Sequence, residues 1–157
     1  MKLRRKIRFL IHKLFYDPTF NNCRIDTMVP GAVEIGENFI AAPGSAIQAH
    51  NAGLVNKTGE YIIGKVKIGN NVFLGANAVV LPGVTIGDNC IIGANSVIAR
   101  NIPANMVASG NPAQILYSVD HYREFCKLSR RVELLDIDTF KNRKQIKNRA
   151  ITKRITI

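Results

Sequence analysis

The chain has little cysteine and no hydrophobic run long enough to cross a membrane. Its three cysteines, Cys23, Cys90 and Cys126, are too few and too scattered for a disulfide framework or a zinc site, and they indicate reduced thiols in a cytoplasmic protein. No apolar segment approaches the roughly 20 residues of a membrane-spanning helix. The apolar residues 9–11 are interrupted at once by polar ones, which argues against a signal peptide.

Acidic residues are also scarce: the chain has 11 Asp and Glu but 22 Lys and Arg, which gives a formal charge of +11. The excess lies at the two ends. Residues 1–15 carry six basic and no acidic residues, and residues 123–157 carry eleven basic and four acidic ones. Residues 16–122 have five basic and seven acidic residues, a charge of −2. The ends can meet an anionic membrane surface, but the middle does not have the charge of a nucleic-acid binder, so we expect no nucleic-acid partner.

The sequence is instead rich in a repeat of six residues. A small or aliphatic anchor recurs at every sixth position, mostly with a second compact residue two positions before it, and eight of the eleven anchors have Asn or Gly three positions after them. The anchors are Cys23, Val29, Ile35, Ala41 and Ile47 and, after one break, Ile68, Leu74, Val80, Ile86, Ile92 and Ile98. The Asn and Gly residues are Asn38, Gly44, Asn71, Asn77, Gly83, Asn89, Asn95 and Asn101.

This period predicts an all-β solenoid. Alternate residues of a strand face the same way, so each anchor and the residue two before it point inward. Asn and Gly adopt left-handed backbone conformations at the least cost, which gives a tight corner every six residues. A period of six is not a multiple of 3.6, so the pattern excludes a helix. Short strands joined by regular corners stack as coils.

The outward residues predict how the faces of the solenoid differ. If three strands make one coil, residues 18 apart share a face. The stacked pairs are then Phe73–Ile91, Val79–Val97 and Lys67–Thr85. Two of the three outer faces are therefore expected to be apolar, which favours a cyclic trimer in which each subunit meets two neighbours.

The repeat breaks once, between Ile47 and Ile62. Residues 48–61 ignore the register, so they are expected to form a loop that leaves the solenoid. An irregular loop on a regular scaffold is where function is expected, and His50 lies in it.

From Asn22 to Leu116 the chain resembles the hexapeptide-repeat acyltransferases, the left-handed β-helix family. The likeness is densest at residues 68–76, 81–89 and 92–98 and in the closing Gly-Asn-Pro-Ala of residues 110–113, which is typical of the sugar and xenobiotic O-acetyltransferase branch. The left-handed coiling is implied by the resemblance alone, because the general rule for parallel crossovers favours the right-handed form.

The expected organisation has three parts. A left-handed parallel β-helix occupies residues 21–113 and carries the loop 48–61. A basic helical extension occupies residues 1–20, where apolar residues at helical spacing allow either contact with an anionic membrane or packing on the trimer. Residues 114–157 form a C-terminal helix and a basic tail.

The resemblance implies acetyl-CoA as co-substrate, no metal, and a homotrimer with active sites between subunits. It also implies a loop histidine as general base, and His50 matches that histidine. A neutral imidazole, with an ordinary pKa of about 6.5, can take the proton of a sugar hydroxyl as the oxygen attacks the thioester. A single base is enough for this, and the sequence shows no Ser/His/Asp arrangement. The alternative is a surface-loop histidine without a chemical role.

Other site residues are carried over by position. Asn22 matches an interface asparagine that helps place the acceptor, and Asp26 is expected to bind a sugar hydroxyl. Asn51 is also expected among the substrate-binding residues, where it either orients the loop or has no role. The alternatives for the first two are a turn asparagine and a solvated carboxylate. The expected coenzyme A contacts are Gly75, Ala76, Gly93 and Ala94 for the pantetheine, Arg100 for a phosphate, and Asn111, Pro112 and Ala113 near the adenine.

The function expected from the resemblance is O-acetylation of a sugar in bacterial surface-polysaccharide biosynthesis. One alternative is an antibiotic acetyltransferase of the streptogramin type, and another is a non-catalytic trimeric scaffold. A carbonic anhydrase on the same fold is rejected, because it needs three zinc-binding histidines and the solenoid region has only His50.

Overall fold

The computed structural model describes residues 23–129 and 134. The expected N-terminal helix of residues 1–20 and most of the basic tail lie outside the described residues. The chain divides into two compact units, Met1–Val119 and Asp120–Ile157. No helix in the described part is both long and apolar enough to span a bilayer.

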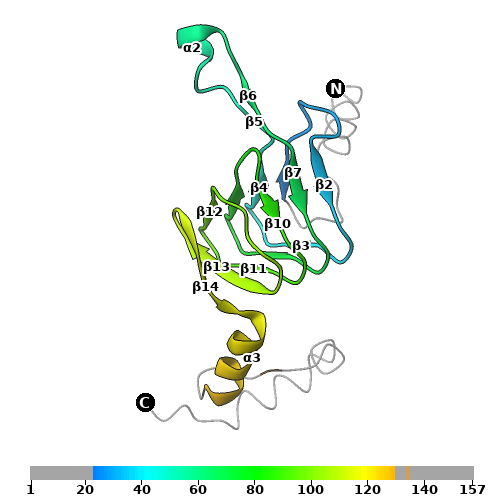
Figure 1. Ribbon diagram of the computed structural model, residues 1–157, viewed down its shortest axis with the longest axis vertical. Coiled ribbons are helices and arrows are strands. Elements are labelled where there is room, and N and C mark those ends of the chain that lie inside the picture. The colour runs from blue at the N-terminus through cyan, green and yellow to red at the C-terminus, as the bar shows by residue number, and fades with distance from the viewer. Residues whose placement is uncertain (1–22, 130–133, 135–157) are drawn as a thin grey trace, which may run out of the picture. The chain divides into compact units, whose positions relative to one another are not determined.

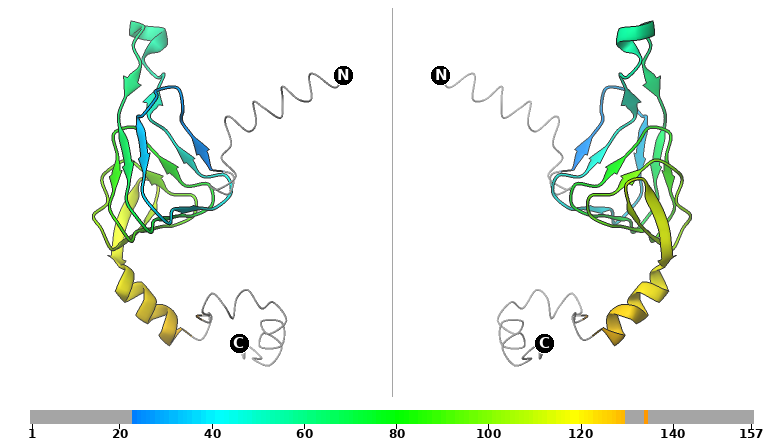
Figure 2. Two further views of the ribbon diagram at one scale, coloured as in Figure 1. Left: turned by 90° about the vertical axis from the view of Figure 1, so that its right-hand side faces the viewer. Right: turned by 90° about the vertical axis from the view of Figure 1, so that its left-hand side faces the viewer.

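Three stacks of short parallel strands wind around one interior (Figures 1 and 2). The first stack, face A, contains β1 (Arg24–Ile25), β4 (Ala46–Ile47), β9 (Val79–Val80) and β12 (Val97–Ile98). Face B contains β2 (Val33–Ile35), β7 (Val66–Ile68) and β10 (Thr85–Ile86). Face C contains β3 (Ile40–Ala41), β8 (Phe73–Leu74), β11 (Ile91–Ile92), β13 (Met106–Gly110) and the antiparallel β14 (Ala113–Ser118). The predicted parallel β-helix is confirmed.

The register of the strands confirms the predicted period. In the two coils that follow the interruption, one pair of strands on each face has Cα partners 18 residues apart, and these are the expected pairs Phe73–Ile91, Val79–Val97 and Lys67–Thr85. The predicted anchors fill the interior: from Ala41 to Ile98 every one is buried, and Val29 and Ile35 near the start are partly buried. The residues two before them, from Val66 to Ser96, are buried too. Inward side chains therefore form two columns that pack along the axis of the solenoid.

The corners are built as predicted at seven of eight positions. Asn38, Asn71, Asn77, Asn89, Asn95, Gly44 and Gly83 all have positive φ. The prediction for Asn101 is wrong, because the left-handed residue of the last coil is Asn105. That coil is two residues shorter: Ile86 bridges to Ile102, and the Asn89 side chain donates to Asn105, 16 residues on. The side chain of Asn101 instead accepts the N–H of Thr85 at 2.8 Å.

The interruption is an ordered hairpin that projects from the coils (Figure 1). β5 (His50–Asn51) pairs antiparallel with β6 (Ile62–Ile63), and the helical turn α2 (Val55–Thr58) lies between them. The predicted loop of residues 48–61 is therefore too short. Ile62 was expected to resume the repeat, but it is 47% exposed on β6, and the coil begins again at Val66.

The C-terminal boundary also differs from the prediction. Residues 114–118 were expected to be helical, but they continue as β14, and α3 (Val119–Leu128) begins after them. Antiparallel pairing with β13 satisfies the backbone of β14, and this outweighs the helical spacing of its apolar side chains. The strand thus belongs with the β-helix, and α3 with the second compact unit.

Candidate functional site

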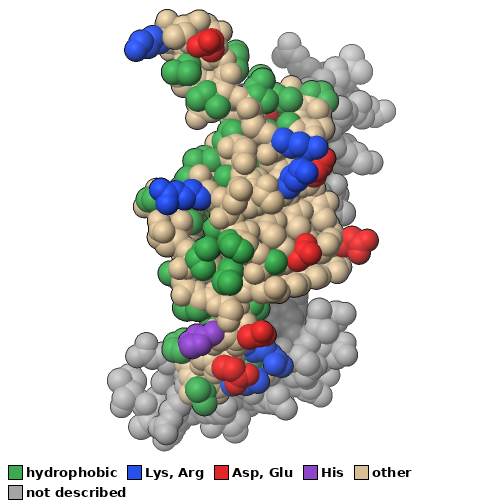
Figure 3. Space-filling model, viewed as in Figure 1, with side chains coloured by type: hydrophobic (Ala, Val, Ile, Leu, Met, Phe, Trp, Pro, Cys, Tyr) green, Lys and Arg blue, Asp and Glu red, His purple; other side chains and the backbone are tan. Residues whose placement is uncertain are grey.

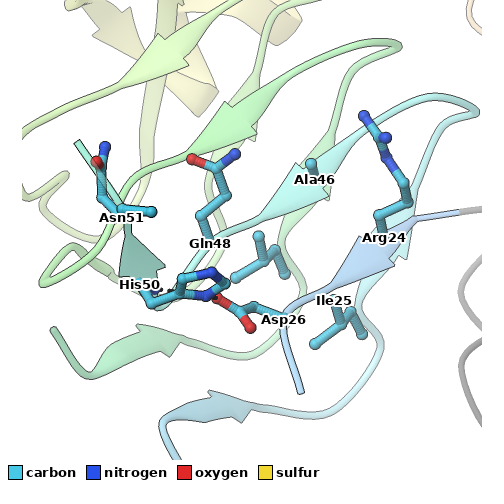
Figure 4. Close-up of a pocket in the computed structure, with 9 residues that line it drawn as sticks. Arg24, Ile25, Asp26, Ala46, Gln48, His50 and Asn51 are labelled. Atoms are coloured by element: carbon cyan, nitrogen blue, oxygen red, sulfur yellow. Dashed lines mark hydrogen bonds and ion pairs between the residues drawn. The ribbon is translucent and has the colours of Figure 1, made fainter. Parts of the chain in front are cut away.

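A pocket of about 470 Å³ lies at the base of the projecting hairpin (Figure 4). Its floor comes from the first two strands of face A, and one wall comes from β5. The lining residues are Arg24, Ile25, Asp26, Ala46, Ile47, Gln48, His50, Asn51 and Ala52. The hairpin leaves the coil directly after β4, which brings His50 to the end of β1.

Asp26 holds His50 in this pocket. Its Oδ2 is paired with Nδ1 of the imidazole ring, and the same oxygen accepts the backbone N–H of Ala49 at 2.9 Å and of His50 at 3.0 Å. Its other oxygen accepts the N–H of Met28 at 3.0 Å. The Asp26 side chain is 6% exposed and that of His50 is 26% exposed. The carboxylate is thus enclosed, while part of the ring stays open to solvent.

These contacts determine which ring nitrogen is free. Burial raises the pKa of Asp26, but hydrogen bonds from Ala49, Met28 and His50 outweigh this effect, and the pKa lies below its ordinary value. Asp26 is therefore ionised at neutral pH. Because a carboxylate can only accept, Nδ1 of His50 carries the proton of their hydrogen bond. In the neutral ring, Nε2 then has an available lone pair.

The other residues predicted near the acceptor have different surroundings. Asn51 is exposed, and its Oδ1 accepts the N–H of Gly53 at 2.6 Å, so its side chain shapes the turn of the hairpin. Asn22 lies outside the described residues. Asp26 was expected to bind a sugar hydroxyl, but its two oxygens already accept four hydrogen bonds. The pairing of Asp26 with His50 was not foreseen, nor were Arg24 and Gln48 as pocket residues.

The expected coenzyme A contacts divide into two kinds. Gly75 and Gly93 are small because the coils stack closely. A Cβ on Gly75 would lie 2.5 Å from the backbone nitrogen of Ala94, and one on Gly93 would lie 2.3 Å from the Ser109 hydroxyl. Ala76 is half-buried and Ala94 is exposed, and their backbone N–H groups have no acceptor in the described part of the chain. Those two donors are therefore not used within the described part of the chain.

The remaining predicted contacts lie in the last coils. Arg100, Asn111 and Pro112 are exposed, and Ala113 is buried at the start of β14. None of the expected coenzyme A residues lines the pocket that contains His50. Across residues 23–129 and 134, no three His, Cys, Asp or Glu side chains are grouped as a metal site requires.

Comparison with known proteins identifies the repeat. Residues 65–100 match the family described as bacterial transferase hexapeptide (six repeats). The chain is 38% identical over 104 residues to the protein YvoF of Bacillus subtilis (strain 168), which covers 66% of this chain and 58% of that protein. It is also 38% identical over 91 residues to galactoside O-acetyltransferase of Escherichia coli (strain K12), covering 56% of this chain and 45% of that protein.

Comparison with solved structures finds proteins of the same kind. A solved structure of galactoside acetyltransferase in complex with coenzyme A aligns with a TM-score of 0.60 at 32% identity, over 73% of this chain and 57% of that chain. Such structures are left-handed β-helices, so the handedness implied by the resemblance is confirmed. This chain spans about half the length of the curated relatives that it matches.

Proposed function

Because its repeats and its fold place this chain among the bacterial hexapeptide-repeat transferases, we propose that it is an acetyl-CoA-dependent O-acetyltransferase with His50 as the general base. The acceptor is a sugar hydroxyl, in the biosynthesis of a bacterial surface polysaccharide. The observation that carries this proposal is the Asp26–His50 pair, which presents a free imidazole nitrogen in an open pocket. The unpaired state of all three cysteines supports a cytoplasmic setting.

The base works through Nε2 of His50. This nitrogen takes the proton of the acceptor hydroxyl as the hydroxyl oxygen attacks the thioester carbonyl carbon. The carbon–sulfur bond then breaks, and the ring returns the proton to the departing thiolate. Asp26 remains ionised throughout: it holds the ring by Nδ1 and offsets the positive charge that the ring carries between the two steps.

Coenzyme A is proposed to lie along the coil corners. The open N–H groups of Ala76 and Ala94 can donate to the pantetheine arm, beside Gly75 and Gly93, which carry no side chain to obstruct it. Arg100 can pair with a phosphate, and Asn111, Pro112 and Ala113 can contact the adenine. Bound acetyl-CoA supplies the activated acetyl group.

A homotrimer is proposed because the proposed base and the proposed coenzyme contacts lie apart on one chain. In a trimer a neighbouring subunit supplies the coenzyme contacts to each His50. The outer surfaces support this arrangement, since face A presents the half-buried Val79 and Val97 and face C presents Ile40 and Phe73, which are 54% and 38% exposed. Face B is polar, and Figure 3 shows charged side chains over β2 and β7.

A thiol-release assay tests the proposed function. Purified protein is given acetyl-CoA and a panel of sugars, nucleotide sugars and glycans, and the acetylated product is identified by mass spectrometry. Acetyl transfer to a sugar supports the proposal. Transfer to a streptogramin and to no sugar would identify the antibiotic alternative instead, and absence of coenzyme A binding in calorimetry would identify a scaffold.

A further inference from the structure

Arg24 contributes a guanidinium to the pocket that contains His50. It is the first residue of β1, its Cα is in register with that of Ala46, and its side chain is exposed. Figure 4 shows Asp26 turned toward His50 and Arg24 extending away from that pair, with Ala46 between Arg24 and Gln48. The small Ala46 side chain leaves room above the strands between these two polar groups.

Arg24 has no acidic partner among residues 23–129 and 134. Asp26 is the one carboxylate that lines the pocket, and its oxygens are used by Met28, Ala49 and His50. Three other cations of the described chain do have a carboxylate partner: Lys65 and Lys67 contact Glu34, and Lys127 contacts Glu124. Among the described residues that line the pocket, the guanidinium is thus a cation without a carboxylate partner.

This charge is local. Residues 16–122 have five basic and seven acidic residues, so Arg24 is not part of a general basic surface. Apart from the Asp26–His50 pair, the other polar side chains that line the pocket are the neutral amides of Gln48 and Asn51. With Asp26 enclosed, the field that a small ligand meets in the pocket is positive on the Arg24 side.

We propose that Arg24 selects an acceptor that carries an anionic group, either a carboxylate or a phosphate, on the same sugar unit or next to it. Arg presents a planar fork of N–H donors that matches both groups in a bidentate way. Gln48 would then hydrogen-bond a neutral hydroxyl of the acceptor, and His50 would face the hydroxyl that is acetylated. This inference rests on the proposed function, because the bound anion is an acceptor only if the protein is an acetyltransferase.

Binding of matched sugars tests the inference without catalysis. Glucose, glucuronic acid and glucose 1-phosphate are titrated into the full chain at fixed ionic strength, and the His50 ring signals are followed by NMR. At least one anion is expected to bind about tenfold more tightly than glucose, as one charge-assisted contact allows. The comparison of glucuronic acid with glucose 1-phosphate shows which anion the site takes.

Two variants assign any preference to Arg24. In Arg24→Gln the anion is expected to bind no better than glucose, whereas the affinity for glucose stays unchanged. Arg24→Lys keeps the charge but not the fork, so it is expected to retain only part of the preference. Lys57→Gln removes an exposed cation from α2 on the same hairpin and is the matched control, expected to bind as the wild type does.

Two results would overturn the inference: equal binding of glucose and both anions by the wild type, or a preference that survives in Arg24→Gln. A failure of the proposed function gives a different result. If the anion preference depends on Arg24 but no thiol is released from acetyl-CoA with any acceptor, the anion site stands and the acetyltransferase proposal falls. If the thiol is released but the anion preference is absent, the acetyltransferase proposal stands and the anion site falls.

Discussion

Asp26 and His50 are 24 residues apart in the sequence, and their side chains are paired across two successive coils. Pairing of β1 with β4 sets the register, since Arg24 and Ile25 lie beside Ala46 and Ile47. Beyond β1 and β4 both segments leave the sheet, so Asp26, which follows β1, contacts the first residues of the hairpin, which follows β4. The first coil thereby fixes the orientation of a ring that the hairpin carries.

The carboxylate of Asp26 is predicted to matter for turnover more than for binding. Asp26→Asn removes the ionised partner of Nδ1, so the ring is no longer held in the tautomer that leaves Nε2 free. We expect kcat to fall on the order of 10³-fold with little change in KM. Steady-state thiol release measures both constants. Asp120→Asn, an exposed site on α3, is the control, and a kcat near that of the wild type in Asp26→Asn would contradict the assigned role.

The same carboxylate predicts how stability depends on pH. The pKa of Asp26 is lowered in the folded protein, so its ionised form stabilises the fold above the pKa of an unfolded Asp, near about 3.9. That contribution is fully present at neutral pH and is lost as the pH falls through the lower, folded pKa. Denaturant unfolding from pH 7 to pH 3, at constant protein concentration, is expected to show a steeper acid loss for the wild type than for Asp26→Asn. Parallel curves for the two proteins would show that Asp26 does not contribute in this way.

Close stacking of the coils predicts a large penalty at Gly75. A Cβ there would lie 2.5 Å from the nitrogen and 2.8 Å from the Cα of Ala94, and backbone atoms cannot yield as a flexible side chain can. We expect Gly75→Ala to lower the free energy of unfolding by about 1–3 kcal/mol. Ala99→Ser, at an exposed position beyond β12, is the control and is expected to be neutral. A Gly75→Ala protein as stable as the wild type would mean that the coils are spaced more widely than described.

Side-chain hydrogen bonds join the corner asparagines of successive coils into a ladder, and at Asn71 the effects of this ladder and of the backbone can be separated. This residue has φ of 56°, accepts from Asn38 at 3.0 Å and donates to Asn89 at 3.0 Å. Asn71→Gly loses only the ladder, whereas Asn71→Ala also strains the left-handed corner. We expect the alanine variant to be less stable than the glycine variant by about 1–2 kcal/mol in denaturant unfolding. Equal stability of the two variants would show that the corner does not select for left-handed residues.

The solenoid could be predicted because its determinants are local. The inward anchors, the corner residues and the faces all follow from one six-residue unit, and the register of Phe73 with Ile91 required only a count of 18. Asn101 was misassigned because the last coil is two residues shorter, and that shortening is decided by the bridge of Ile86 to Ile102. A local pattern does not contain such a change in register.

The site could be predicted only in part. His50 was singled out because the repeat breaks around it and because the resemblance implies a loop histidine there. The hairpin was expected to be a plain loop, since two-residue strands leave little periodicity to detect. The partner of His50 was missed because it depends on how two coils and the hairpin meet. The helix expected from residue 114 failed for a related reason: the pairing of β14 with β13 is a tertiary preference that overrides the helical spacing.

The most direct test of the account is the turnover of His50→Ala, measured by acetyl-CoA thiol release with an accepted sugar, next to the wild type and Lys57→Ala. We expect kcat to fall by about 10²- to 10⁴-fold in His50→Ala, Lys57→Ala to be unaffected, and light scattering to give a trimer for all three proteins. A His50→Ala trimer that still acetylates the sugar at the wild-type rate would contradict the role of His50 as the general base.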